Sequence, residues 1–95
     1  MLTIDDAYSL VEEEFSKFDP SVDPVIVRGA TKEFSWGWVV FYQSRKYLET
    51  NEVRHASAGN APYLVNKHTG EIATTGTARP IDEYVREYES KIGAR

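Results

Sequence analysis

The stretch Trp36–Gln43, which reads WGWVVFYQ, is the strongest strand signal in the chain. It is filled with aromatic and β-branched side chains, which favour extended backbone. Because side chains alternate along a strand, the stretch divides into two apolar faces. One face is predicted to carry Trp36, Trp38, Val40 and Tyr42, and the other to carry Val39 and Phe41. A strand that is apolar on both faces is usually central in its sheet, so we predict that it lies in the middle of the fold.

A glycine interrupts this stretch between its two tryptophans. Gly37 permits a close approach of neighbouring backbone or a bulge. The alternative is that Trp36 and Trp38 form a flat aromatic platform for a base or a sugar. We favour a role in the core, because this stretch is the best candidate for a central strand.

Apolar stripes with helical spacing lie at both ends of the chain. The first stripe spans residues 4–18, and Thr3 is suited to cap the helix that it predicts. The second stripe spans residues 81–92 and predicts a closing helix that ends at Gly93.

Three shorter strands are predicted besides the central one. Residues 25–28 form a β-branched run, and residues 29–35 read as a polar connection. Residues 62–66 and 71–75 read as the two strands of a hairpin, with Gly70 at the turn position that needs a positive φ. We therefore predict an α+β fold with the order α-β-β-β-β-α.

The predicted architecture is a single domain over residues 1–95, because a chain of this length holds one core. Short connections favour antiparallel neighbours, so the four strands should form one antiparallel sheet with the two helices on one face. The expected core residues are Tyr8, Val11, Phe15, Trp38, Val40, Tyr84 and Val85.

The composition excludes several classes of protein. Of 95 residues, 41% are hydrophobic and 27% are charged, which is typical of a folded chain. There is no cysteine, so disulfides, thiolate zinc sites and a thiol nucleophile are excluded. The start MLTIDDAYSL does not resemble a secretory signal, and no apolar run approaches the ~20 residues of a membrane span. We expect a cytoplasmic protein with no membrane partner.

The charge is negative overall and uneven along the chain. A net charge of −4 argues against a nucleic-acid partner, which would call for a basic patch. Residues 1–44 carry three basic and eight acidic groups, whereas residues 45–95 carry eight basic and seven acidic groups. The acidic half could steer a basic partner towards the protein. A solvated helix face explains the same pattern without a partner.

No constellation of catalytic or metal-ligating residues is visible. His55 and His68 have no second histidine three or four residues away, and paired acidic residues fall at helix starts or on exposed faces. We expect no enzyme activity, no catalytic residue, no metal site and no cofactor. The competing hypothesis is a small hydrolase that uses His55 with Glu49 or Glu52.

An ordered set of short motifs resembles the immunity protein 35 family, and it extends from about Trp36 to Glu89. The set reads Gly37-Trp38, Arg45-Lys46-Tyr47-Leu48-Glu49-Thr50, Ala58-Gly59-Asn60-Ala61-Pro62, Thr69-Gly70-Glu71-Ile72, Gly76-Thr77-Ala78, Pro80, Glu83-Tyr84 and Tyr88-Glu89. The resemblance implies a bacterial cytoplasmic antidote that binds and neutralises a cognate polymorphic toxin. It implies no particular toxin-contacting residue.

The long segment 45–61 is the candidate partner site. Long irregular segments in compact domains often carry function. Tyr47 and Arg54 belong to residue types enriched at binding hot spots, and Glu49 and Glu52 could meet a basic toxin surface. The alternative is that these side chains only cover the sheet or face solvent. The acidic helix face at residues 12–14 is the second candidate for the partner contact.

Two further expectations follow from the predicted architecture. Two helices on one face would leave the other face of the sheet open, which predicts a weak homodimer or a protein contact there. The second function considered is a general binding or chaperone-like holdase module, which would hold partly unfolded clients on such a face.

Overall fold

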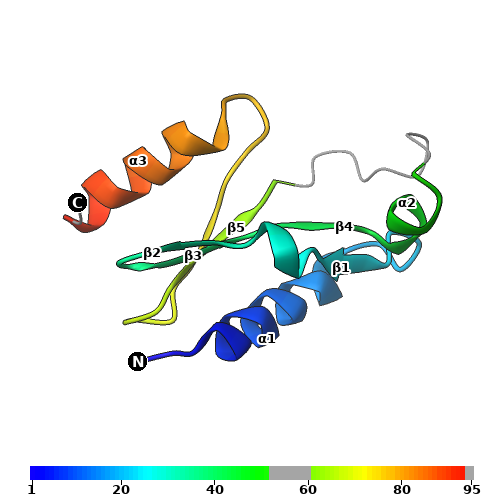
Figure 1. The fold of residues 1–95 in the computed structure, drawn as a ribbon, viewed down its shortest axis with the longest axis horizontal. Coiled ribbons are helices and arrows are strands. Elements are labelled where there is room, and N and C mark those ends of the chain that lie inside the picture. Colours follow the sequence, from blue (N-terminus) through cyan, green and yellow to red (C-terminus); the bar gives the residue numbers. More distant parts are fainter. Residues whose placement is uncertain (52–60, 94–95) are drawn as a thin grey trace.

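The computed structural model describes residues 1–51 and 61–93, and Figure 1 shows the arrangement of its helices and strands. The helices are α1 (Ile4–Glu14), α2 (Arg45–Thr50) and α3 (Ile81–Ile92), and short 3-10 turns span Phe15–Lys17 and Arg28–Ala30. The strands are β1 (Pro24–Ile26), β2 (Lys32–Phe34), β3 (Gly37–Val40), β4 (Tyr42–Ser44), β5 (Tyr63–Asn66) and β6 (Ile72–Thr74). The α+β class predicted from the sequence is confirmed.

The main sheet is antiparallel and has four strands in the order β2-β3-β5-β6. All four residues of β3 are buried, as are all four of β5, so the predicted central strand is confirmed. The stretch Trp36–Gln43 does not remain one strand, because β3 ends before Phe41 and β4 begins after it. β4 pairs with β1 in a separate two-stranded sheet.

β2 lies in the segment that was predicted to be a polar connection. It pairs with β3 through the register Lys32↔Val39 and Phe34↔Gly37. Its burial pattern is exposed, exposed and half-buried, so it has no apolar alternation that would identify it. The strand predicted at residues 25–28 corresponds to β1, which belongs to the two-stranded sheet. In the main sheet, β2 occupies the position predicted for that strand.

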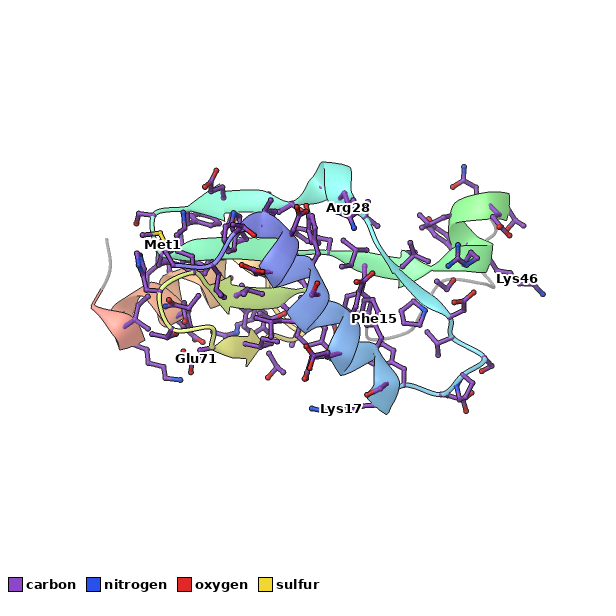
Figure 2. The ribbon with its side chains drawn as sticks, turned by 90° about the horizontal axis from the view of Figure 1, so that it is seen from below. Met1, Phe15, Lys17, Arg28, Lys46 and Glu71 are labelled. Atoms are coloured by element: carbon purple, nitrogen blue, oxygen red, sulfur yellow. The ribbon has the colours of Figure 1, made fainter. Side chains whose placement is uncertain are left out.

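The two long helices cover opposite faces of the main sheet, so the predicted placement on one face is wrong. α1 contributes Ala7, Tyr8 and Val11 to a buried cluster with the β3 residues Trp38 and Val40. On the other face, a second cluster joins α3 to the sheet through Val39, Leu64, Val85 and Tyr88. Figure 1 shows α1 below the sheet and α3 above it, and Figure 2 shows α1 lying across the strands. Both apolar faces of β3 are thereby buried.

Trp36 faces the α3 side, opposite to the predicted side. It lies in the turn between β2 and β3, where the alternation of a strand does not apply. Its indole N–H donates to Glu89 at 2.9 Å, and its ring lies 4.9 Å from that of Tyr88. Trp38 obeys the alternation and faces α1.

Gly37 fills the close-approach role that its position predicts. A β-carbon there would lie 1.9 Å from the carbonyl oxygen of Val65 on β5. No side chain fits at that distance, so the spacing of β3 and β5 depends on a glycine at this position.

The predicted cap and most of the predicted core are present. The Thr3 side chain accepts a hydrogen bond from the backbone N–H of Asp6 at 3.2 Å, and the Asp6 carboxylate accepts one from the N–H of Thr3 at 2.9 Å. This reciprocal pair is a capping box. Of the expected core residues, Phe15 and Tyr84 are half-buried and the rest are buried.

Candidate protein-binding surface

The helix α2 carries the part of the predicted partner site that the structure describes. Ser44 caps it by accepting the Tyr47 N–H at 3.2 Å. Asn51 ends it in a left-handed conformation, with φ 58°, and donates its N–H to the Tyr47 carbonyl at 2.7 Å. The helix begins directly after the Ser44 cap, at Arg45.

Contacts with the loop before β1 fix the orientation of α2. The backbone N–H of Arg45 donates to the carbonyl of Asp23 at 3.0 Å, and its guanidinium Nε donates to the Asp23 carboxylate at 2.9 Å. Both side chains are more than half exposed, so the ion pair itself adds little stability. The backbone bond and the helix cap hold the element in place, with α2 at one end of the molecule (Figure 1).

Leu48 is an exposed apolar side chain on α2. It is 45% exposed, and in residues 1–51 and 61–93 the only other large apolar side chain of this kind is the terminal Met1. Tyr47 is half-buried and Glu49 is exposed. The helix therefore presents an apolar side chain next to an acidic one, which is a suitable combination for a protein contact.

The structure brings together only part of the predicted site. Tyr47 and Glu49 lie on α2, whereas Glu52 and Arg54 lie outside the described residues. His55, the histidine of the competing hydrolase hypothesis, also lies outside them. His68 is exposed in the hairpin turn. Leu48 was not predicted as an anchor, because the exposure of a side chain cannot be read from residue type.

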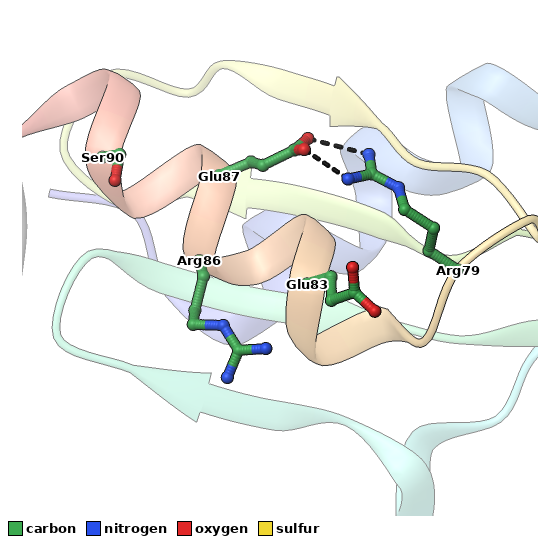
Figure 3. A pocket seen from close by; sticks show the side chains of 5 residues that line it. All are labelled: Arg79, Glu83, Arg86, Glu87 and Ser90. Carbon is green, nitrogen blue, oxygen red and sulfur yellow. Dashed lines mark hydrogen bonds and ion pairs between the residues drawn. The ribbon is translucent and has the colours of Figure 1, made fainter.

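An open depression of about 410 Å³ lies on the outer side of α3 and is an alternative candidate site (Figure 3). It is lined by Arg79, Glu83, Arg86, Glu87 and Ser90. The Arg79 guanidinium donates two hydrogen bonds to the Glu87 carboxylate, one of them at 2.9 Å. These bonds raise the pKa of Arg79 and lower the pKa of Glu87.

The Arg79 guanidinium contacts Tyr84 in addition to Glu87. Its central carbon lies 4.5 Å from the centre of the Tyr84 ring. With its donors directed at Glu87 and its face on Tyr84, this arginine clamps the segment before α3 onto the helix. Lys91, one turn further along α3, does not share this carboxylate, because its ammonium lies 3.9 Å from the Glu71 carboxylate. We therefore read the depression as a structural feature of the α3 start.

The exposed face of α1 is strongly acidic. Asp5, Asp6, Glu12 and Glu13 are exposed, and the last turn of the helix contains no basic residue. The two aspartates are favourable at the helix N-terminus, whereas glutamates near the C-terminus oppose the helix dipole. This face is the second candidate surface for a basic partner.

The described part of the chain contains neither a metal-binding cluster nor a membrane-spanning helix. There, no group of three or more histidine, cysteine or acidic residues is arranged to hold a metal ion. None of the helices found there is long and apolar enough to cross a membrane.

Comparison with known proteins places the chain in a family. It is 36% identical over 91 residues to a protein described as "Uncharacterized protein YrhB" from Escherichia coli (strain K12), covering 96% of this chain and 93% of that relative. No solved structure matches the chain. The model of the family Immunity protein 35 matches residues 5–90, which span both helix layers and the whole main sheet. The chain therefore belongs to the immunity protein 35 family.

Proposed function

We propose that this protein is a bacterial cytoplasmic immunity protein that binds a cognate polymorphic toxin and blocks it without catalysis. Its family supports an immunity role and, in general, a protein partner. The observation that supports a specific contact is α2, where Leu48 is exposed beside the exposed Glu49 on a helix that is capped and tied to the loop before β1.

In this proposal, the toxin contacts α2 and the segment that follows it. Leu48 supplies apolar area, and Glu49 supplies a charge for a basic toxin surface, with the half-buried Tyr47 on the same helix. Contacts of this mixed kind are typical of transient protein interfaces, in which a few side chains contribute most of the affinity. Glu52 and Arg54 remain predicted members of the same surface.

The holdase alternative depends on a broad apolar face. Both faces of the main sheet are covered by helices, and the described residues expose only Met1 and Leu48 among large apolar side chains. The specific complex is therefore the better supported reading. The open sheet face that motivated a homodimer is absent, and self-association remains an untested prediction.

An immunity protein of this kind is expected to be encoded next to its toxin, so the test is a binding titration of the purified protein with the toxin domain from the neighbouring gene. We expect Leu48→Ala combined with Glu49→Lys to weaken binding by about 2 kcal/mol or more, since an apolar anchor and a charge contact are lost together. Both side chains are exposed, so the thermal stability of the variant should stay near that of the wild type.

Glu13→Lys is the matched control, because it makes the same charge reversal on the exposed face of α1. If Glu13→Lys weakens the complex and the α2 variant does not, the toxin contacts the acidic face of α1. If the wild type neither binds this toxin nor protects cells that express it, the proposed function is wrong.

A further inference from the structure

The strand β6 forms one edge of the main sheet, and its hydrogen-bonding pattern can be derived from the hairpin. The N–H of Asn66 donates to the carbonyl of Glu71 at 2.9 Å, and the carbonyl of Asn66 accepts the N–H of Gly70 at 2.9 Å. Asn66 therefore directs both backbone groups towards the β6 side. Because backbone groups alternate along an antiparallel strand, Leu64 does the same and bonds to its register partner Ala73.

The neighbours of Ala73 then direct their backbone groups the other way. The pairs Val65↔Ile72 and Tyr63↔Thr74 are the non-bonded pairs of this ladder. The N–H and C=O groups of Ile72 and Thr74 consequently point away from β5, along the free edge of the sheet. In the described residues, no other strand pairs with that edge, and Figure 3 shows β6 as the outermost strand beside α3.

The two edge strands of the main sheet, β2 and β6, differ in the charge of their side chains. The β2 edge carries Lys32 and Glu33, and charged side chains on an edge strand discourage pairing with another chain. The β6 edge reads Ile72-Ala73-Thr74, with no charge and no proline. It is the edge that remains competent to accept a further strand.

A groove of about 170 Å³ lies directly beside this edge, between β6 and α3. Ala73 faces α3, and its small side chain leaves this space open. Tyr84 and Tyr88 of α3 also line the groove, with Glu87 and Lys91 among the polar residues that border it. The volume is sufficient for one aliphatic side chain of a partner.

We propose that the β6 edge accepts an extended segment of the toxin as a fifth strand of the main sheet. The outward groups of Ile72 and Thr74 would bond to its backbone. The residue opposite Ala73 would point to the same face of the sheet and place an aliphatic side chain in the groove. The inference rests on the proposed function, because the toxin supplies the strand, and it adds a second contact surface to α2.

A second copy of this chain fits the same edge less well. An antiparallel pairing of two β6 strands that satisfies Ile72 and Thr74 places Ala73 opposite Ala73 of the copy. Two methyl groups would then face each other beside two unfilled grooves of about 170 Å³ each. Water would then occupy these grooves, whereas a larger side chain from a partner would displace it and bury apolar surface of Leu64, Ala73 and Tyr84, so such a partner is favoured.

The experiment compares Thr74→Pro with Thr74→Val in calorimetric titrations against the toxin domain encoded by the neighbouring gene. Proline removes the outward N–H of residue 74 and leaves the bonds from β6 to β5 in place, as is tolerated on edge strands. Valine keeps that N–H and the branched shape. We expect about tenfold weaker binding for Thr74→Pro, and affinity within about twofold of the wild type for Thr74→Val.

Amide hydrogen exchange of the wild type gives a readout that needs no variant. The Thr74 amide should exchange rapidly in the free protein and become protected in the complex. This measurement decides the matter if Thr74→Pro does not fold. A third variant, Ala73→Val, should also weaken binding, because it occupies part of the groove.

The outcomes separate the two proposals. If the wild type binds the toxin while Thr74→Pro binds equally well and the Thr74 amide stays unprotected, the strand proposal is wrong and the proposed function stands. If the wild type does not bind the toxin, both are wrong. If the free protein forms dimers that Thr74→Pro abolishes, the occupant of this edge is a second copy and not the toxin.

Discussion

Gly37 is the position where a single added methyl group has the largest predicted effect. The β-carbon of Gly37→Ala would lie 1.9 Å from the Val65 carbonyl oxygen and 2.9 Å from its carbonyl carbon, and both are backbone atoms of the neighbouring strand. We expect a loss of about 3 kcal/mol in the free energy of unfolding, because β3 and β5 must separate. Urea denaturation measures this loss.

Gly29→Ala is the control for that measurement, since the β-carbon that it adds would have no residue other than its near neighbours in the chain within 4 Å. It should change stability by less than about 0.5 kcal/mol. Equal stability of the two variants would show that the close strand contact is not needed.

For single residues, the sequence predicted the backbone roles of the glycines well. It did not predict which distant side chains contact each other. The positive φ of Gly70 and the close approach at Gly37 were both predicted, because each follows from what glycine alone permits. The bond from Trp36 to Glu89 joins residues 53 positions apart. Such a partner is set by packing in three dimensions, and no local pattern encodes it.

The stability of α1 as an element depends on its first turn. Thr3→Ala removes the side-chain acceptor of the Asp6 N–H and half of the capping box. We expect a loss of about 1 kcal/mol. Thr3→Ser keeps the hydroxyl and should retain most of the stability. A loss of the same size in Thr3→Ser would mean that the methyl group, and not the cap, is what matters.

The elements differ in how far their sequences identify them. Both α1 and α3 have apolar stripes; α1 also has the Thr3 cap at its start, and α3 has Gly93 at its end. Their existence and approximate limits were therefore predictable. β2 was missed because Lys32 and Glu33 are exposed and its three residues are too few to show a period. At the candidate site, Tyr47 and Glu49 were proposed as contact residues from the sequence. The hydrogen bond from Arg45 to Asp23, which helps to position their helix, was not predictable, since it spans 22 positions.

The molecule as a whole has three layers, with the main sheet between α1 and α3. The sequence already contained the signal for this arrangement, because a strand that is apolar on both faces needs cover on both. The prediction placed both helices on one face of the sheet, although the second apolar face of β3 also had to be covered. It was wrong for this reason. The exposed sheet face expected as an interface was a consequence of that error.

Alkaline unfolding is a prediction at the same scale, because buried tyrosines occur on both sides of the sheet. Burial, with a smaller effect of Tyr63, raises the pKa of Tyr42 to about 12. Burial also raises the pKa of Tyr63 and of Tyr88. Tyrosines in the unfolded chain have a pKa of about 10. Because the pKa is higher in the folded protein, the fold favours the neutral phenols, and their contribution to the free energy of unfolding is complete below pH ~10. Stability should fall as the pH rises from about 10 towards 12.

Urea midpoints measured from about pH 9 to about pH 12 test this dependence. Tyr42→Phe has no phenol to ionise at that position, so its stability should decline less steeply across the same range, whatever its stability at neutral pH. A decline as steep as that of the wild type would show that Tyr42 is not among the groups responsible.

The two tryptophans lie two positions apart in the chain, yet they belong to different layers. Trp36 lies in the cluster under α3, next to Tyr88, and Trp38 lies in the cluster under α1, with the ammonium of Lys67 5.1 Å from its ring centre. The protein thus contains one fluorescent probe for each side of its sheet. With Trp36→Phe and Trp38→Phe, rapid-mixing fluorescence can follow the docking of each helix separately and show whether the two sides assemble together or in turn.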